Sequence, residues 1–160
     1  NVVCPTRKEI DLSTDFILTD RCFDIVINNA GINPLNSFVD TNSKETMQTN
    51  YFAPLRIVQS CLPHMVKQNY GRIINIGSIW INLTKQFRHA YSASKSALHS
   101  ITTSVVSEYS EYNILANTIS PGFIKTDLTA KNNTPEQINA LIECIPLKRL
   151  GLPKEVADFV

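Results

Sequence analysis

Three short runs rich in apolar and β-branched residues, separated by two long helical stretches, constrain the fold of this chain most strongly. The runs cover residues 24–28, 71–77 and 114–120, and such runs are typical of strands within a parallel sheet. The stretches between them, about 43–68 and 91–112, are long enough for crossover helices. Because parallel strands need such a crossover, the sequence predicts an α/β fold with a doubly wound parallel sheet.

Around this framework the sequence predicts several shorter elements. They are strands at 2–4 and 9–12, a short helix capped by Ser13 or Thr14 and running through Arg21, loops at 32–42 and 79–89, an irregular segment at 123–133, a helix at 135–144 and a last helix that begins at Pro153. Pro54 and Pro63 fall inside the first long helical stretch. Proline in a helix interior removes a backbone hydrogen bond, so we expect a break or kink near each, or a new helix start at Pro54.

Length and charge narrow the class of protein. The 160 residues suit one domain, and because the patterns at both ends stop within an element, we expect a single partial domain over 1–160, incomplete at both ends. The 15 basic and 14 acidic residues leave a net charge of +1, which gives no electrostatic reason to expect a nucleic acid or an anionic membrane as partner. No apolar run reaches the ~20 residues of a membrane span.

The four cysteines carry no metal-binding or disulfide pattern. They are far apart in the sequence and none forms a C-x-x-C pair: Cys4, Cys22, Cys61 and Cys144. We therefore expect buried free thiols, no metal, and a reducing, cytoplasmic location.

Tyr91 and Lys95, with Ser78 thirteen residues upstream, form the pattern with the clearest chemistry. Positions i and i+4 of a helix share a face, so the phenol and the ammonium can serve one site. An ammonium near a phenol favours the phenolate, and we expect Lys95 to lower the Tyr91 pKa. Ser78 ends a predicted strand, which is where open α/β sheets place ligands. The alternative is a surface Tyr and Lys on an amphipathic helix.

Several motifs in chain order resemble the short-chain dehydrogenases/reductases, and the resemblance covers nearly the whole chain, from about residue 9 to 160. The tail from Pro146 to Pro153 is similar to that of 3-oxoacyl-(acyl-carrier-protein) reductase-like members. The matching positions are the strand-ending Asn28-Asn29-Ala30-Gly31, Asn50, Ser78, Tyr91 and Lys95 of a catalytic tetrad, and Pro121-Gly122 followed by Ile124 and Thr126.

The resemblance implies hydride transfer between NAD(P)H and a carbonyl or alcohol carbon, with Tyr91 as acid/base. Ser78 would hold the substrate oxygen, Lys95 would bind ribose hydroxyls, and Asn50 would hold a water that links Lys95 to solvent. The implied cofactor contacts are Asp11, Asn28, Ala30, Gly31, Tyr91, Lys95, Pro121, Gly122, Ile124 and Thr126. Two of these have other interpretations: Thr126 as a helix N-cap and Asp11 as a turn residue.

The chain departs from the family at its start. The Gly-rich phosphate turn of the family would lie before Asn1, so we expect residues 1–160 alone to bind a dinucleotide poorly. Arg7 follows the second predicted strand, where a basic residue accommodates the 2′-phosphate of NADP, and this favours NADP slightly over NAD.

Partners and a competing function follow from the same residues. The helices at 43–68 and 91–112 carry apolar residues on more than one face, so the chain is expected to form homo-oligomers through them, although burial within one subunit would look the same. The expected substrate is a small carbonyl compound or alcohol of unspecified identity. The alternative is a non-catalytic relative that serves as a binding or scaffold protein.

Overall fold

The computed structural model describes residues 2–14, 16 and 22–160. They divide into two compact units, residues 1–119 and residues 120–160. The helix predicted from Ser13 or Thr14 through Arg21 lies mostly outside the described residues. None of the helices in the described ranges has the length and apolar character that a membrane crossing requires.

The first unit contains a parallel three-stranded sheet. Its strands are β1 (Ile25–Asn28), β2 (Gly71–Ile76) and β3 (Ile114–Ile119), in the spatial order β1-β2-β3. Register pairs such as Ile27 with Ile74, and Ile74 with Asn117, align the carboxyl ends of the strands. The predicted strands and the α/β fold class with a parallel sheet are confirmed.

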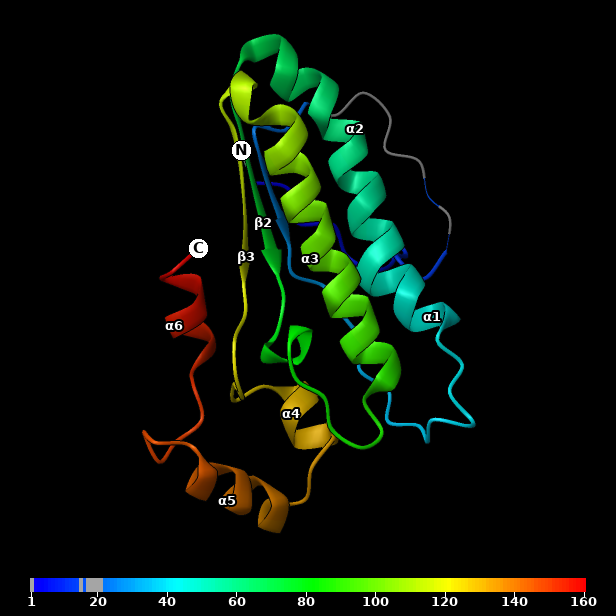
Figure 1. Ribbon diagram of the computed structural model, residues 1–160, viewed down its shortest axis with the longest axis vertical. Helices are drawn as coiled ribbons and strands as arrows, with labels where there is room; N and C mark the ends of the chain where they lie inside the picture. Colours follow the sequence, from blue (N-terminus) through cyan, green and yellow to red (C-terminus); the bar gives the residue numbers. More distant parts are fainter. Residues whose placement is uncertain (1, 15, 17–21) are drawn as a thin grey trace. The chain divides into compact units, whose positions relative to one another are not determined.

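Two long helices connect the strands and lie side by side on one face of the sheet (Figure 1). The first connection comprises α1 (Lys44–Met47), a π-helical segment (Gln48–Phe52) and α2 (Ala53–Gln68). The second is α3 (His89–Tyr109), which begins two residues before the predicted start. Both crossovers advance along the sheet in the same direction, so the right-handed rule places both helices on the same face.

The prolines of the first connection behave differently from each other. Pro54 lies in the first turn of α2, directly after the π-helical segment, which agrees with the predicted new helix start. Pro63 lies inside α2, which continues as an α-helix to Gln68, so the expected break there is wrong. Pro63 is exposed, and water can satisfy the carbonyl that lost its partner.

The hydrophobic core fills the space between the sheet and these two helices. Its most buried members include Met65, Ile73, Leu98 and Ile114. On the other face of the sheet, Ile25 and Ile27 are 54% and 51% exposed. Strand β1 is therefore buried on one face only, because α2 and α3 cover only that face of the sheet.

The residues before β1 contain no strand within 2–14. The strands predicted at 2–4 and 9–12 are wrong: these residues form turns and extended chain, and Val2 is 97% exposed. A strand needs a neighbouring strand to pair its backbone groups, and neither run pairs with another strand in the part of the chain that the structure describes. The N–H groups of Glu9 and Ile10 donate to the Thr6 carbonyl instead. Three of the expected buried thiols are exposed, those of Cys4, Cys22 and Cys144, whereas Cys61 is buried and all four are free.

The second unit is built from short helices joined by irregular segments. It contains α4 (Asp127–Lys131), α5 (Pro135–Cys144) and α6 (Pro153–Ala157), of which α5 and the start of α6 agree with the prediction. The segment predicted as irregular contains α4, whose first turn is capped by the Thr126 hydroxyl. A short parallel bridge joins Ile124 to Gly151, and none of the residues of this unit is fully buried.

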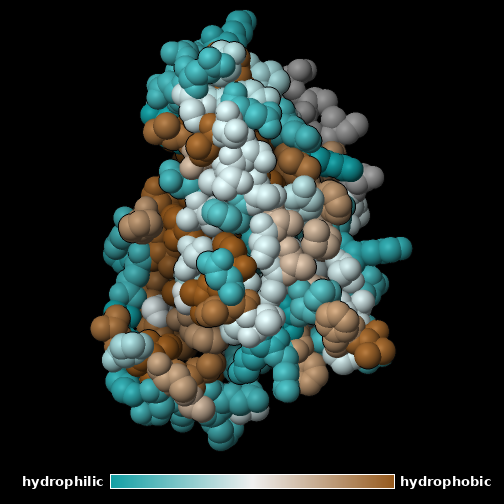
Figure 2. Space-filling model, viewed as in Figure 1, coloured by the Kyte–Doolittle hydropathy of each residue, from teal (hydrophilic) through white to brown (hydrophobic). Residues whose placement is uncertain are grey.

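The molecular surface mixes polar and apolar side chains. On the face shown in Figure 2, patches of hydrophobic residues are interspersed with hydrophilic ones. Phe52 and Val106, on the first and second helical connections, are each 44% exposed. Apolar side chains of both connections thus remain accessible in the single chain.

Candidate active site

Lys95 and Tyr91 lie one turn apart on α3, with Lys95 buried against the end of β2. The Lys95 residue is only 3% exposed, and its Nζ donates a hydrogen bond of 2.7 Å to the Ile76 carbonyl oxygen. The same Nζ lies 5.8 Å from the centroid of the Tyr91 ring. The predicted i, i+4 pair therefore shares one helix face, and the surface interpretation of these two residues does not hold.

Ser78 completes the group from the end of β2. It is 6% exposed, has an extended backbone, and its Oγ accepts a hydrogen bond of 3.3 Å from the Trp80 N–H at the start of a 3₁₀ turn (Ile79–Ile81). The Ser78 side chain is also close enough to the Tyr91 phenol to lower its pKa by hydrogen bonding. We call Ser78, Tyr91 and Lys95 the Ser-Tyr-Lys cluster.

Asn50 lies in the π-helical segment and is fully buried. Its Nδ2 donates to the Ile32 carbonyl and to Ser94 Oγ, and its Oδ1 accepts from the Ile32 N–H, all at 2.9 Å. Ser94 Oγ in turn donates to the Tyr91 carbonyl at 2.8 Å. Single π turns are frequent at functional sites, and this one ties the loop after β1 to the first turn of α3.

Gly31 lies directly beside Asn50 and Lys95. A Cβ at this position would lie 3.4 Å from Asn50 Oδ1 and 3.5 Å from Lys95 Nζ. The loop after β1 can therefore approach the ammonium closely, and the structure brings the predicted Asn28–Gly31 motif together with the predicted tetrad.

Burial dominates the electrostatics of the cluster. It lowers the pKa of Lys95 to about 8. It also raises the pKa of Tyr91, an effect opposed by the hydrogen bond with Ser78 and by the positive charge of Arg88. The expectation that Lys95 lowers the Tyr91 pKa is wrong for this structure, because the ammonium is directed at the Ile76 carbonyl and the phenol is desolvated.

Arg88 is the residue that sequence reasoning missed. It occupies the N-cap position of α3, is only 8% exposed, and burial lowers the pKa of its guanidinium. The available signal was its position three residues before Tyr91, which puts the two side chains on neighbouring parts of one helix surface.

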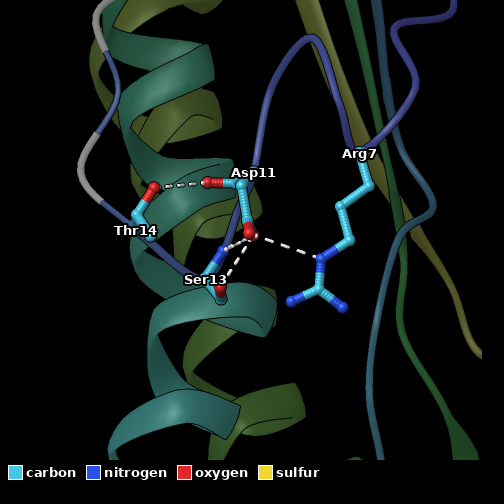
Figure 3. A network of polar contacts seen from close by, with 4 residues as sticks. All are labelled: Arg7, Asp11, Ser13 and Thr14. Carbon is cyan, nitrogen blue, oxygen red and sulfur yellow. Dashed lines mark hydrogen bonds and ion pairs between the residues drawn. The ribbon is translucent and has the colours of Figure 1, made fainter.

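Half of the predicted cofactor contacts outside the cluster line one pocket of about 500 Å³ beside the carboxyl end of β1. These are Asp11, Asn28, Ala30 and Gly31, and Arg7 lines the same pocket. Asp11 also organises a turn: its Oδ1 accepts from the Ser13 N–H and hydroxyl at 2.9 and 2.7 Å, and its Oδ2 lies 3.4 Å from Arg7 Nε (Figure 3). These hydrogen bonds to the charged form lower the pKa of Asp11.

Asn28 belongs to a buried row of polar side chains across the sheet. Its Nδ2 donates to Asn75 Oδ1 at 2.8 Å, Asn75 Nδ2 donates to Thr102 Oγ1 at 2.8 Å, and Thr102 Oγ1 lies 2.7 Å from Thr118 Oγ1. Asn28, Asn75 and Thr118 are register partners on β1, β2 and β3. We call Asn28, Asn75, Thr102 and Thr118 the cross-strand row.

The remaining predicted cofactor contacts lie in the second unit. Pro121, Gly122 and Ile124 precede α4, and Ile124 forms the bridge with Gly151. Thr126 caps α4 by accepting from the Thr129 N–H at 3.3 Å, which is the N-cap role given above as its alternative. Because the two units are described separately, the contribution of these four residues to cofactor binding stays a prediction.

The fold and the Ser-Tyr-Lys cluster define a class: a parallel, Rossmann-type α/β protein with a hydroxyl, a phenol and an ammonium at the carboxyl end of its sheet. The sequence profile described as short chain dehydrogenase matches residues 18–137. The chain belongs to the short-chain dehydrogenase family.

Named relatives agree with this assignment. A 3-oxoacyl-(acyl-carrier-protein) reductase of Buchnera aphidicola (subspecies Acyrthosiphon pisum) is 40% identical over 160 residues, covering 96% of this chain and 65% of the relative. A solved 3-oxoacyl-(acyl-carrier-protein) reductase of Agrobacterium tumefaciens with NADP bound is 29% identical, with a TM-score of 0.76, over 82% of this chain and 54% of that one.

A second solved structure carries the other nicotinamide cofactor. It is a 4-hydroxyisoleucine dehydrogenase complexed with NADH, 30% identical with a TM-score of 0.79, over 84% of this chain and 58% of that one. The chain spans between 34% and 65% of the length of the curated relatives it matches.

Proposed function

We propose that the protein containing this chain is an NAD(P)-dependent oxidoreductase that transfers a hydride between a nicotinamide and a carbonyl or alcohol carbon. The observation that carries the proposal is the convergence of Ser78, Tyr91 and Lys95 at the carboxyl end of β2. The match of residues 18–137, which include all three residues, to the short chain dehydrogenase family supports it further.

The protonation states fit the reductive direction. Burial keeps Tyr91 in its neutral phenol form at pH 7, because the pKa is raised, so the hydroxyl can donate its proton to the oxygen of a substrate carbonyl. Ser78, whose side chain acts on that phenol, can hold the same oxygen. In the oxidative direction the proton returns to the Tyr91 oxygen.

Lys95 supplies a positive charge and unused donors. With a pKa of about 8 it is mostly protonated at pH 7, and only one of its three N–H groups has a protein acceptor among the described residues. The remaining N–H groups of the ammonium can therefore bind ribose hydroxyls. Asn50, whose Nδ2 protons are both used, acts here mainly by fixing the loop against α3, and its Oδ1 retains capacity for a water.

The residues present fit the nicotinamide riboside half of a dinucleotide. Gly31 leaves room for a close approach beside Lys95, and the pocket of about 500 Å³ along β1 offers Asp11 and Arg7 at a distance from the cluster. The bound cofactor supplies the hydride, and the chain's own residues orient it and move the proton. We propose NADP over NAD, since Arg7 offers a guanidinium in this pocket, although Asp11 partly neutralises it.

Substrate, partners and location complete the proposal. The substrate is a small carbonyl compound or alcohol, and a 3-oxoacyl thioester is one member of that class. Homo-oligomers form through the two helical connections, where a groove between α2 and α3 is bordered by Leu55, Leu62 and Tyr109. Four free thiols favour a reducing, cytoplasmic setting.

The decisive experiment is Tyr91→Phe in the full-length protein, with NAD(P)H oxidation measured against a panel of ketones, acyl thioesters and sugars. We expect kcat/KM to fall about 10²–10⁴-fold, because the proton donor is lost while the ring and its packing remain. Tyr70→Phe is the matched control, since Tyr70 stacks with Arg72 and lies outside the cluster.

Retained turnover in Tyr91→Phe, with thermal unfolding unchanged, would remove Tyr91 from the mechanism. The scaffold alternative would be favoured if the unmutated protein turned over no member of the panel although it was folded in the absence of cofactor. The retention of Asn50, Ser78, Tyr91 and Lys95 in one chain argues against that alternative, because a scaffold has no chemical need for all four.

A further inference from the structure

Arg88 is a buried cation without a carboxylate partner in the part of the chain that the structure describes. It is 8% exposed, and no described Asp or Glu forms an ion pair with it. Its backbone is fixed on both sides, since its N–H donates to the Lys85 carbonyl at 3.2 Å and its carbonyl accepts from the Ser92 N–H at 2.8 Å. The Arg88 backbone is thus held in place, whereas its guanidinium has no ion-pair partner among the described residues.

An unpaired buried guanidinium is costly. Arginine does not lose its proton in proteins, and its five N–H donors need acceptors once they leave water. No hydrogen bond from the Arg88 side chain to a described residue is formed, whereas the exposed Arg149 holds Glu155 through two bonds of 2.8 and 2.6 Å. Arg88 also precedes the 21-residue helix α3, whose N-terminal end adds positive potential. The position is therefore suited to receive an anion.

The cation borders the place where the reacting oxygen would lie. Arg88 and Tyr91 are three residues apart at the start of α3, a spacing that puts Cβ atoms about 5–6 Å apart. The charge of Arg88 acts on the Tyr91 phenol, and the Ser78 side chain acts on the same phenol. An anionic group held by Arg88 would lie within a few atoms of a carbonyl held by Ser78 and Tyr91.

We propose that Arg88 binds a carboxylate of the substrate, so that the protein acts on oxo acids or the corresponding hydroxy acids in preference to neutral carbonyl compounds. The inference rests on the proposed function, because it places the reacting carbonyl at Ser78 and Tyr91. A guanidinium can hold a carboxylate through two parallel hydrogen bonds, which fixes the orientation of the substrate as well as its charge.

The kinetic test uses the full-length protein and pairs of 2-, 3- and 4-oxo acids with their methyl esters. Each pair differs mainly in charge. We expect at least one acid to have a higher kcat/KM than its ester, and Arg88→Met to lower that acid-to-ester ratio about 10- to 100-fold, as expected for a lost bond between charged groups. Arg88→Lys should restore part of the ratio. Lys67→Met, which removes an exposed charge from α2, is the control and should leave the ratio unchanged.

A binding measurement separates this inference from the proposed function. Succinate, as a carboxylate probe, is titrated by calorimetry into the full-length protein with NADP present. We expect weak binding that Arg88→Met weakens at least about tenfold and Lys67→Met does not. Unchanged succinate binding in Arg88→Met, or an equal loss of acid and ester turnover, would overturn the inference.

Two mixed outcomes are equally decisive. A protein that reduces esters through Tyr91 without any preference that depends on Arg88 keeps the proposed function and loses the carboxylate site. A protein that binds succinate through Arg88 but reduces none of the carbonyl compounds keeps the anion site and loses the proposed function.

Discussion

The cross-strand row and the Ser-Tyr-Lys cluster are both buried, and they lie next to each other along β2, where Asn75 and Ser78 are three residues apart. In the row, the Asn75 side chain receives one hydrogen bond and donates another, and both partners are protein groups. In the cluster, the Lys95 ammonium donates to one acceptor among the described residues, and Ser78 is the one described side chain whose hydrogen bonding lowers the Tyr91 pKa. Buried polar groups that are satisfied by the protein hold the strands together, whereas those with unused capacity are available to a ligand.

The position of each group in the sheet explains the contrast. Asn28, Asn75 and Thr118 are register partners within the paired part of the strands, so a neighbouring strand lies about one strand spacing from each of them. Ser78 lies beyond the last paired residue of β2, where the ladder has ended and neighbouring strands no longer supply partners. The edge of the sheet therefore concentrates incompletely paired groups, which is the physical basis for ligand binding there.

Lys95→Met is the variant with the largest expected effect. It should remove catalytic activity while leaving every hydrogen bond of the cross-strand row in place. We expect kcat/KM of the full-length protein to fall about 10²–10⁴-fold through loss of the ammonium. We expect no loss of stability at pH 7, since methionine fills similar space without the cost of burying a charge. Steady-state kinetics and urea unfolding of the cofactor-free protein measure the two effects, with Lys67→Met as the control for loss of an exposed charge.

Lys95→Met should also change how the stability of the protein depends on pH. The Lys95 pKa is about 8 in the folded state, against 10.5 for an ordinary lysine, so between these pH values the unfolded state binds more protons and stability rises with pH. The rise amounts to at most about 3 kcal/mol and is complete above pH 10.5. In Lys95→Met this contribution should vanish, and a parallel pH dependence of both proteins would contradict the buried-ammonium assignment.

Asn75→Leu tests whether the cross-strand row stabilises the sheet. It should destabilise the full-length protein by about 2–5 kcal/mol, because Asn28 Nδ2 and Thr102 Oγ1 each lose a buried partner. Asn117→Leu, at an exposed position of β3, is the matched control and should change stability little. A loss in Asn75→Leu no larger than in the control would show that the row does not stabilise the sheet.

The elements that sequence alone predicted are those whose signals are local. The three strands and the two long helices follow from apolar periodicity, and the pairing of Tyr91 with Lys95 follows from helical geometry. The strands predicted at 2–4 and 9–12 failed because an apolar run becomes a strand only beside a partner, which the sequence of the run does not specify. The helix α4 was missed although Thr126 and Asp127 form a recognisable N-terminal signal.

Residues defined by distant partners were beyond prediction. Asn75 looks like one polar residue within an apolar strand, and its partners lie 47 and 27 residues away in the sequence. Arg88 looks like a solvated loop cation, and only the fold shows that it is buried. The shift of the Tyr91 pKa was predicted in the wrong direction. Sequence spacing places the Lys95 ammonium near the phenol, but it does not show which acceptor the ammonium donates to or how strongly the phenol is desolvated.

Thr118→Val sharpens the comparison at the far end of the cross-strand row and has the smallest expected effect. Thr118 Oγ1 lies 2.7 Å from Thr102 Oγ1 and 3.0 Å from His99 Nδ1, and Thr118 and His99 are only half-buried. Valine keeps the shape of the side chain, and water can replace the lost partner, so we expect a destabilisation of about 1 kcal/mol in urea unfolding. Thr103→Val is the control, since its hydroxyl bonds only the Ser100 carbonyl on the exposed side of α3. A loss of stability equal to that of Asn75→Leu would mean that the cross-strand row acts as one cooperative unit. Its partly solvated end would then contribute as much to stability as its fully buried centre.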